Sequence, residues 1–482
     1  MNMLAMSSAQ AGPRAVPAAP SALERRKLVA ILVSLALLAG IWMMPTPAGL
    51  PVAGQRALAV TLFTVIWWVS GVMAPAYTTL LLCLGYIVLG LAPPTTVFAL
   101  WTSPLMWLVV GAFLIAAAVT KSGLATRVAY AFMSCYARSY GSTVTLVYVL
   151  GFVLSFLIPH PFPRTLLIMA MVTAIIEGSR MEPADARALG FATFASATAT
   201  SMILLTGDSL LNTATIGFAG VELSWLGWAG YMAVPGVLAS VLMWGLQLLV
   251  FRPTSRLQIN PQGVQAARAR LGPLSAAEKR TLAWVVLALL LWVTEAWHHL
   301  APAWVAIGVA VGLALPVIGD VLHPPDFTTG INWPILMFLV GALAIGTVGA
   351  ETGMAQWIAR VLLPAVPPAN PYVFALLIGG ATIASHMVLG SALAVMSIVT
   401  PSVVAYATAV GWNALFPALL VYTAVQIHYL LPFQHITILL GAGPTGRYGS
   451  RETLRYGLPL TALTMLVLLL EVAWWQLIGL LG

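Results

Sequence analysis

The sequence predicts an all-helical polytopic membrane protein, with about eleven transmembrane helices plus two re-entrant helical hairpins in two inverted repeats. The first ground is composition: 61% of the 482 residues are hydrophobic and only 7% are charged. A soluble domain carries roughly 25% charged residues, so the lipid bilayer must be the solvent for most of this chain. The other two grounds are helix breakers inside long apolar segments and a segment that occurs twice.

Eleven apolar segments are suited to crossing a hydrocarbon core of about 30 Å. They are Leu28–Met44, Ala57–Met73, Tyr77–Leu91, Leu105–Thr120, Ala188–Gly220, Leu223–Val250, Thr281–His299, Pro302–Ile318, Asn332–Gly349, Trp412–Gly443 and Tyr456–Leu481. Two of them, Ala188–Gly220 and Trp412–Gly443, are too long for one plain helix and contain polar interruptions.

Two further apolar segments are divided by helix breakers. Ser142–Ile176 is interrupted by Ile158-Pro-His-Pro-Phe-Pro-Arg164, and Tyr372–Ala405 is interrupted around Ser385–Ser391. Three prolines within five residues cannot continue a helix, and broken backbone at membrane depth is tolerated only where protein or a wet cavity surrounds it. We therefore expect two re-entrant hairpins, each of which enters and leaves the membrane on one side.

The charged residues indicate the orientation of the chain. With residues 1–26 as a disordered cytoplasmic tail and both hairpins re-entrant, 18 of the 21 basic residues lie on the cytoplasmic side, as the positive-inside rule requires. Eleven crossings then place the C-terminus outside. Residues 27–251 form the first transmembrane repeat, 252–280 a cytoplasmic loop and 281–482 the second repeat. The net charge of +8 follows this topology and does not indicate nucleic-acid binding.

One segment of the chain occurs twice. Residues 104–129 align without gaps to residues 334–359, and identical residues coincide at 104, 110, 111, 112, 115, 123, 125 and 129. Each copy is followed by a broken pair and then by an interrupted segment. Because the two copies run in opposite directions across the membrane, the sequence predicts an inverted repeat, with binding near the midplane where the broken elements meet.

The residues at those broken elements are the candidates for binding. The candidate substrate-binding residues are His160, Pro161, Phe162, Arg164, Thr165, Ser391, Ala392, Leu393, Gln434 and His435. The candidates for binding a coupling ion or lining the site are Thr206, Gly207, Asp208, Asn212, Pro432 and Gly441. Free backbone N–H groups at helix ends favour an anion at such a place.

The ionisable candidates each have alternative roles. The Arg164 guanidinium either binds a substrate carboxylate bidentately or gates the site, or it pairs with an acid or with capping carbonyls. Asp208 either binds sodium, carries a proton or pairs with Arg164. His160 and His435 either couple protons near neutral pH or serve only as hydrogen-bonding groups. Glu471 lies toward the outer end of its segment, where its carboxylate can reach water, and is assigned no role.

The order of elements resembles the divalent anion–sodium symporter family over nearly the whole chain from Leu28. The branch of bacterial and plastid di- and tricarboxylate exchangers reads Ile-Pro-Ser-Asn-Thr-Ala-Arg at its first tip, where this chain reads Ile158-Pro-His-Pro-Phe-Pro-Arg164. At the second tip, His386-Met387 and Ser391-Ala-Leu393 stand where the family has His, Tyr and Ser-x-Thr. The last helix carries the family's Trp pair, Trp474 and Trp475. The paired Ser-Asn-Thr motifs, which hold carboxylate and sodium in the family, are thus degenerate here.

The resemblance implies a secondary active transporter of small organic anions, di- or tricarboxylates, that works by sodium symport or anion exchange. It also implies a homodimer with an elevator-like motion in a bacterial inner membrane. The alternatives are a carrier of an inorganic divalent anion such as sulfate, and a non-transporting membrane scaffold or sensor with an eroded site. No Walker A loop, HExxH helix or GxSxG elbow is present, so neither an enzyme nor a cofactor is expected. Sodium or a proton would be the coupling ion.

Overall fold

The chain is described by a computed structural model over residues 22–179, 181–253 and 262–481, and no strand occurs among these residues. The first half contains α1 (Ala22–Met43), α2 (Val52–Ser70), α3 (Pro75–Val88), α4 (Pro94–Val97), α5 (Ala99–Thr102), α6 (Pro104–Ser122), α7 (Leu124–Tyr136), α8 (Tyr140–Val153), η1 (Leu154–Phe156), α9 (Pro161–Gly178), α10 (Pro183–Thr200), η2 (Leu205–Asp208), α11 (Ser209–Ala219) and α12 (Trp225–Val250). The rest contains α13 (Gln262–Arg270), α14 (Ala276–Val293), α15 (Glu295–His298), α16 (Pro302–Ala314), α17 (Pro324–Thr329), α18 (Trp333–Glu351), α19 (Met354–Leu362), α20 (Pro371–Leu389), α21 (Ala392–Thr408), α22 (Leu415–Ile427), η3 (Pro432–Gln434), α23 (Ile436–Gly441) and α24 (Ser450–Leu477).

The helical elements fit a polytopic membrane protein. Among the described residues, eight helices are long and apolar enough to cross a membrane, namely α1, α2, α6, α9, α12, α18, α20 and α24. Two of these, α9 and α20, belong to the predicted hairpins, so the total of eleven crossings stays a prediction. Helix α1 begins at Ala22, within the segment expected to be a disordered tail. Residues 1–21 of that segment lie outside the described residues.

Both broken pairs are present, but each break is shorter than expected. Helix α9 begins at Pro161, because a proline in the first turn lacks only an N–H that has no intrahelical partner anyway. The first break is therefore residues 157–160, and Arg164 belongs to the first turn of α9. Helix α20 continues to Leu389, and the second break is confined to Gly390, at φ 64°, and Ser391, the N-cap of α21.

The order of elements repeats as the aligned segments predicted. In each half a long apolar helix (α6 or α18) is joined to the next helix through a glycine with positive φ, Gly123 at 85° or Gly353 at 77°. A short amphipathic helix (α7 or α19), a broken pair and an interrupted helix follow. Gly123 and Gly353 occupy the same place in the alignment, and both need the left-handed conformation that glycine adopts freely. The inverted relation of the two copies stays a prediction.

The two halves are interlocked through these apolar helices. Helix α6 packs against α16 of the second half, and α18 packs against α3 of the first. A Cβ atom on Gly111 would lie 2.7 Å from Ala306, and one on the aligned Gly341 would lie 2.7 Å from Thr79. Glycine at both positions thus lets helix backbones approach closely, as is common in membrane helix packing.

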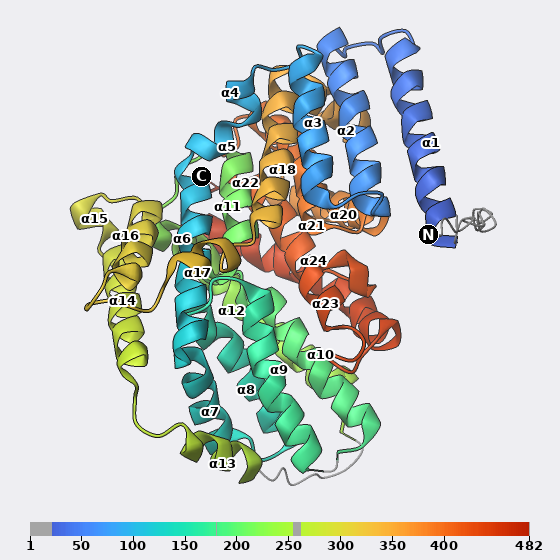
Figure 1. The fold of residues 1–482 in the computed structure, drawn as a ribbon. Helices are drawn as coiled ribbons and strands as arrows, with labels where there is room; N and C mark the ends of the chain where they lie inside the picture. Colours follow the sequence, from blue (N-terminus) through green and yellow to red (C-terminus); the bar gives the residue numbers. More distant parts are fainter. Residues whose placement is uncertain (1–21, 180, 254–261, 482) are drawn as a thin grey trace, which may run out of the picture.

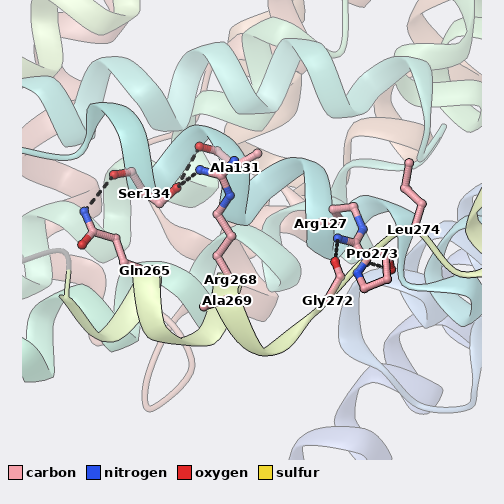
Figure 2. Close-up of a pocket in the computed structure, with 9 residues that line it drawn as sticks. All are labelled: Arg127, Ala131, Ser134, Gln265, Arg268, Ala269, Gly272, Pro273 and Leu274. Atoms are coloured by element: carbon pink, nitrogen blue, oxygen red, sulfur yellow. Dashed lines mark hydrogen bonds between the residues drawn. The ribbon is translucent and has the colours of Figure 1, made fainter.

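The loop predicted at 252–280 contains a helix of its own. Helix α13 packs along α7 and α9 at one end of the molecule, opposite α1, α2 and α3 (Figure 1). Figure 2 shows the cavity of about 900 Å³ between α7 and α13, where Arg268 donates to Ser134 Oγ at 2.9 Å and Arg127 donates to Gly272 O at 2.8 Å. The segment is therefore attached to the short helix that leads into the first broken pair.

Five ion pairs occur among the described residues, and the predicted orientation stays a prediction. The pairs are Lys121–Asp326, Arg127–Glu278, Arg187–Glu452, Arg280–Asp320 and Arg447–Glu177.

Candidate functional site

The first tip is the break between η1 and α9 with the first turn of α9, and the first interruption is the segment 201–208 between α10 and α11. Hydrogen bonds join the two into one unit. Arg164 donates to Ile158 O at 3.2 Å within the tip, and to Gly207 O at 3.1 Å and Ser201 Oγ at 2.7 Å in the interruption. Ser209 donates to Pro159 O through both its backbone N and its Oγ, at 3.1 and 2.8 Å. A fully buried guanidinium therefore joins these two elements.

This geometry matches one of the alternative roles of Arg164. Its two terminal nitrogens donate to the protein's own oxygen atoms, and the role in binding substrate stays a prediction. The Nε atom has no hydrogen-bond partner. The alternative of capping carbonyls describes the observed contacts, and the guanidinium contributes a buried positive charge beside them.

Asp208 does not form an ion pair with Arg164, which corrects another expectation. Its Oδ1 accepts from the backbone N of Leu210 and Leu211, at 3.2 and 3.3 Å, as the N-cap of α11. A carboxylate in this position satisfies free N–H groups and interacts favourably with the helix dipole. Asp208 is 3% exposed, and its charge is therefore balanced chiefly by helix α11 and by the nearby but unbonded guanidinium.

The second tip is the junction of α20 and α21, and the second interruption is the segment 428–435 between α22 and α23. They form a matching unit without any charged group. His386 Nε2 donates to Gln434 O at 2.8 Å, and Gln434 Oε1 accepts from the backbone N of Leu430 and Leu431 at 2.6 and 2.8 Å. Gly390 has φ 64°, and a Cβ there would lie 2.8 Å from Phe433. The tip and the interruption are in contact here as well, so each broken pair is seated on the interruption that follows it in the chain.

Two histidines cap helices at these elements. His160 Nδ1 accepts from Phe162 N at the start of α9, and His435 Nδ1 accepts from Thr437 N at the start of α23, both at 3.3 Å. A ring nitrogen that accepts a hydrogen bond carries no proton, so each ring is neutral and its Nε2 is the donor. His435 is 1% exposed and its Nε2 has no partner, whereas His160 is half-buried at the tip.

Polar side chains join the two units across the halves. Tyr422 Oη donates to Asn212 Oδ1 at 2.6 Å, and Gln426 Nε2 donates to Thr198 O at 3.0 Å. Asn212 in turn donates from Nδ2 to the carbonyl oxygens at 201, 204 and 205, at 2.9–3.1 Å. The four broken elements thus belong to one polar cluster.

The other predicted residues have mostly local roles. Thr165 Oγ1 donates to Phe162 O at 2.8 Å, and Trp225 Nε1 donates to Thr206 Oγ1 at 3.4 Å. Gly441 lies against Phe194 and Tyr448, where a Cβ would not fit, and no contact ties it to the tips. The remaining candidates flank the tips and the second interruption. Pro161, Ala392, Leu393 and Pro432 are buried, while Phe162 and Ser391 keep part of their surface accessible.

Sequence reasoning assigned no role to four residues of this region. Ser201 and Tyr422 bond the cluster together, and His386 closes the second unit. Glu471 was expected to reach water at the outer end of its span but is 0% exposed, which makes that expectation wrong. A polar residue in an apolar span was the signal available for Tyr422 and Glu471. Their partners lie 210 and 48 residues away in the chain, so the sequence could not identify them.

The carbonyl oxygens of the first interruption accept hydrogen bonds from the protein itself. Asn212 and Arg164 donate to its carbonyl oxygens, and a guanidinium charge stands at Gly207 O. The described residues contain no group of three or more His, Cys, Asp or Glu side chains that could hold a metal ion. Helix N-termini, a buried guanidinium and imidazole N–H donors instead favour an anion.

Known proteins resemble this chain over most of its length. A "Membrane protein" of Cupriavidus necator is 26% identical over 494 residues, covering 96% of this chain and 94% of that protein. The "Dicarboxylate transporter 1, chloroplastic" of Spinacia oleracea is 25% identical, covering 68% of this chain and 59% of its own. The "Sodium-dependent dicarboxylate transporter SdcS" of Staphylococcus aureus is 24% identical, covering 66% of each. A solved structure of the Alcanivorax borkumensis YdaH transporter has a TM-score of 0.49 at 16% identity, over 95% of this chain and 98% of that one.

A family model described as "Sodium:sulfate symporter transmembrane region" matches residues 25–481. The match covers every element of the polar cluster and both halves of the fold. The relatives named above with an activity are transporters and not enzymes. The chain therefore belongs to the sodium:sulfate symporter family, that of the divalent anion–sodium symporters, and is an integral membrane transporter.

Proposed function

We propose that the chain is a secondary active transporter that exchanges small organic anions, di- or tricarboxylates, across a bacterial inner membrane. The observation that carries this proposal is the pair of imidazole Nε2 donors, on His160 at the first tip and on His435 at the start of α23, together with the buried Arg164 charge at the first tip. Carboxylate oxygens accept strongly from such donors, and a fixed positive charge in a low-dielectric interior favours an anion. The names of two relatives, both dicarboxylate transporters, support the same substrate class.

The proposed binding place is the junction of the two tips and the two interruptions. His160, Phe162 and Ser391 keep part of their surface accessible, so an anion would arrive at the tips. The imidazoles replace the hydroxyl and amide groups of the family motifs as hydrogen-bond donors. Arg164 acts by its charge and by holding the first tip on its interruption, not by a bidentate grip.

Exchange is favoured over sodium symport by the first interruption. Its carbonyl oxygens, which would otherwise be available to a sodium ion, accept from Asn212 and Arg164 instead. Sodium symport, with an ion beside Asp208, remains the second candidate because one relative is named sodium-dependent. A homodimer with elevator-like motion, a cytoplasmic N-terminus and an outer C-terminus complete the proposal.

Uptake by the purified protein in proteoliposomes tests the proposal. Labelled succinate, citrate and sulfate are offered with and without a sodium gradient, and with and without unlabelled anion inside. We expect succinate or citrate uptake that is accelerated by internal anion and is independent of sodium. Uptake of sulfate alone would identify the inorganic-anion carrier, a strict sodium requirement would identify symport, and no uptake of any anion would favour the scaffold or sensor alternative.

A further inference from the structure

One buried acid is not used by the proposed binding site. Glu471 on α24 is fully enclosed, at 0% exposure. Thr423 Oγ1 of α22 donates to its Oε1 at 2.7 Å, whereas its Oε2 has no hydrogen-bond partner. None of the ion pairs in the described part of the chain involves it. Apolar residues that are themselves almost fully buried, Val467, Leu468 and Val472, flank it on its own helix.

These surroundings suit a neutral carboxyl and not a carboxylate. An ionised carboxylate removed from water is very costly unless a cation and further donors compensate it, and a single hydroxyl does not. A protonated carboxyl fits the observed contacts, because its carbonyl oxygen can accept from Thr423 while Oε2 carries the proton. An ionisable side chain at such a place in a membrane protein usually marks a function.

No fixed positive charge on the neighbouring helices neutralises Glu471. The titratable or charged residues on the four helices that pack most extensively against α24 are Tyr422 on α22, Tyr372 and His386 on α20, Tyr231 on α12, and Asp185 and Arg187 on α10. His428, which follows α22, bonds to Thr461 of α24 at 3.0 Å. Arg187, the one permanent cation among them, pairs with Glu452 at the far end of α24. His386 donates to Gln434 O.

Helix α22 connects Glu471 to the binding cluster. Thr423 bonds to Glu471, and the preceding residue, Tyr422, bonds to Asn212 at 2.6 Å. Asn212 holds three carbonyl oxygens of the first interruption, next to Arg164 and Asp208. Tyr422 lies within electrostatic range of both Asp208 and Glu471, so a charge on Glu471 is felt in the cluster.

We propose that Glu471 is a proton-binding site whose occupancy is coupled to anion binding, so that the carrier moves a proton together with its substrate. The inference rests on the proposed transport function. In the protonation step the carboxylate takes H⁺ from a hydronium ion and leaves water, and release on the other side of the membrane reverses it. A substrate anion in the same low-dielectric interior disfavours the Glu471 carboxylate, so proton and anion strengthen each other's binding.

Infrared spectroscopy tests the protonation without any transport. The purified wild-type protein should show the C=O stretch of a buried protonated carboxyl at neutral pH, and Glu471→Gln should lack it. The glutamine is close in shape and can still accept from Thr423, so this variant is expected to fold. Glu222→Gln, which changes an exposed acid, should retain the band. A spectrum in which Glu471→Gln removes no protonated band would overturn the proposal.

A pH gradient tests the coupling. In vesicles without internal anion and with the membrane potential clamped, an acid exterior of one pH unit should drive up to about tenfold accumulation of labelled succinate by the wild type, since one pH unit is a tenfold driving force per proton. Glu471→Gln should exchange succinate at equal pH but show no gradient-driven accumulation, and Glu222→Gln should behave as the wild type. Accumulation by Glu471→Gln equal to the wild type would overturn the coupling.

A second variant covers the case in which Glu471→Gln does not fold. Thr423→Val removes the donor that the described residues supply to Glu471 Oε1, and we expect it to shift the infrared band and weaken the response to the pH gradient. If neither the band nor the accumulation changes, the proposal fails. If the wild type carries no tested anion but the band is present and lost in Glu471→Gln, the proposed substrate class is wrong while the proton site stands.

Discussion

The two tip units perform the same mechanical task with different chemistry. In the first half, a buried guanidinium reaches from the tip to Gly207 O and Ser201 Oγ in the interruption. In the second half, the neutral imidazole of His386 reaches from the tip to Gln434 O. Both contacts seat a broken pair on the interruption that follows it, but only the first brings a permanent charge into the interior.

This difference indicates that the positive charge that attracts an anion comes from the first half. Neutral hydrogen-bonding groups come from both halves. Arg164 and Asp208 are both in the first half, whereas the second contributes Ser391, Gln434 and His435 as neutral groups. A repeated fold does not require a repeated site, because backbone geometry is set by breakers and glycines while the charge is set by single side chains.

The largest effect is expected from breaking the charged contact. Arg164→Ala leaves two carbonyl oxygens and the Ser201 hydroxyl without their donor, and each bond from a charged donor contributes about 1.5–3 kcal/mol. We expect succinate uptake to fall to the level of empty vesicles, and Arg164→Lys to recover little because lysine lacks the guanidinium's fork. Arg138→Ala, at an exposed arginine, is the matched control. Near-normal uptake by Arg164→Ala would disprove its role.

The two capping histidines should show smaller and nearly equal effects. His160→Ala and His435→Ala each remove an Nε2 donor to the anion, and we expect KM for succinate to rise about tenfold, as for one lost hydrogen bond to a charged group. Each also loses a helix cap, at a stability cost of about 1 kcal/mol. Asparagine retains both a capping oxygen and an N–H donor, so the asparagine variants should stay close to the wild type. Equal loss in the alanine and asparagine variants would show that the imidazoles act otherwise.

A still smaller effect is expected from breaking the neutral contact. His386→Leu removes one uncharged hydrogen bond between the second tip and its interruption, so Gln434 O loses the imidazole donor. The expected cost is about 1 kcal/mol of stability, visible as a Tm lower by a few degrees in detergent, with succinate exchange largely retained. A loss of transport as complete as in Arg164→Ala would mean that the two contacts are equivalent.

The smallest effect is expected at Arg127 and Glu278, which belong to neither tip. Glu278 lies outside the predicted span Thr281–His299, and the hydrogen bond from Arg127 at 2.7 Å lowers the pKa of its carboxyl. A lowered pKa in the folded state stabilises the protein above the ordinary glutamate pKa of about 4.3, and this contribution disappears as the pH falls through the lowered value. The Tm difference between wild type and Glu278→Gln should be constant near neutral pH and shrink in acid. A difference that grows in acid would contradict the assignment.

Much of the fold could be predicted because a lipid bilayer allows a spanning chain few backbone conformations. A helix satisfies its own backbone, so long apolar runs predict the helices and their order. Gly123 and Gly353 matched in the alignment and both adopt positive φ. The breaks were predicted too long, because Pro161 and Pro163 are tolerated in the first turn of α9 and α20 continues to Leu389.

The candidate site was predicted as a set of elements and not as a set of contacts. The tips and interruptions do meet, but Arg164 bonds to carbonyl and hydroxyl oxygens where an ion pair with Asp208 was expected. Tyr422 was not anticipated, since its bond to Asn212 joins residues 210 apart in the chain. Such contacts depend on which faces of distant helices meet.

The sequence by itself determined that this is a membrane protein, that helix breakers divide two of its apolar segments, and that one pattern of helices occurs twice. All of these follow from local properties: hydropathy, the missing N–H of proline and the free φ of glycine. Only the tertiary structure decided that Asp208 caps a helix, that Arg164 joins a tip to an interruption, and that Glu471 is enclosed with one unpartnered oxygen. Burial and hydrogen bonding of a side chain depend on helices that are remote in the chain, and no local pattern encodes them.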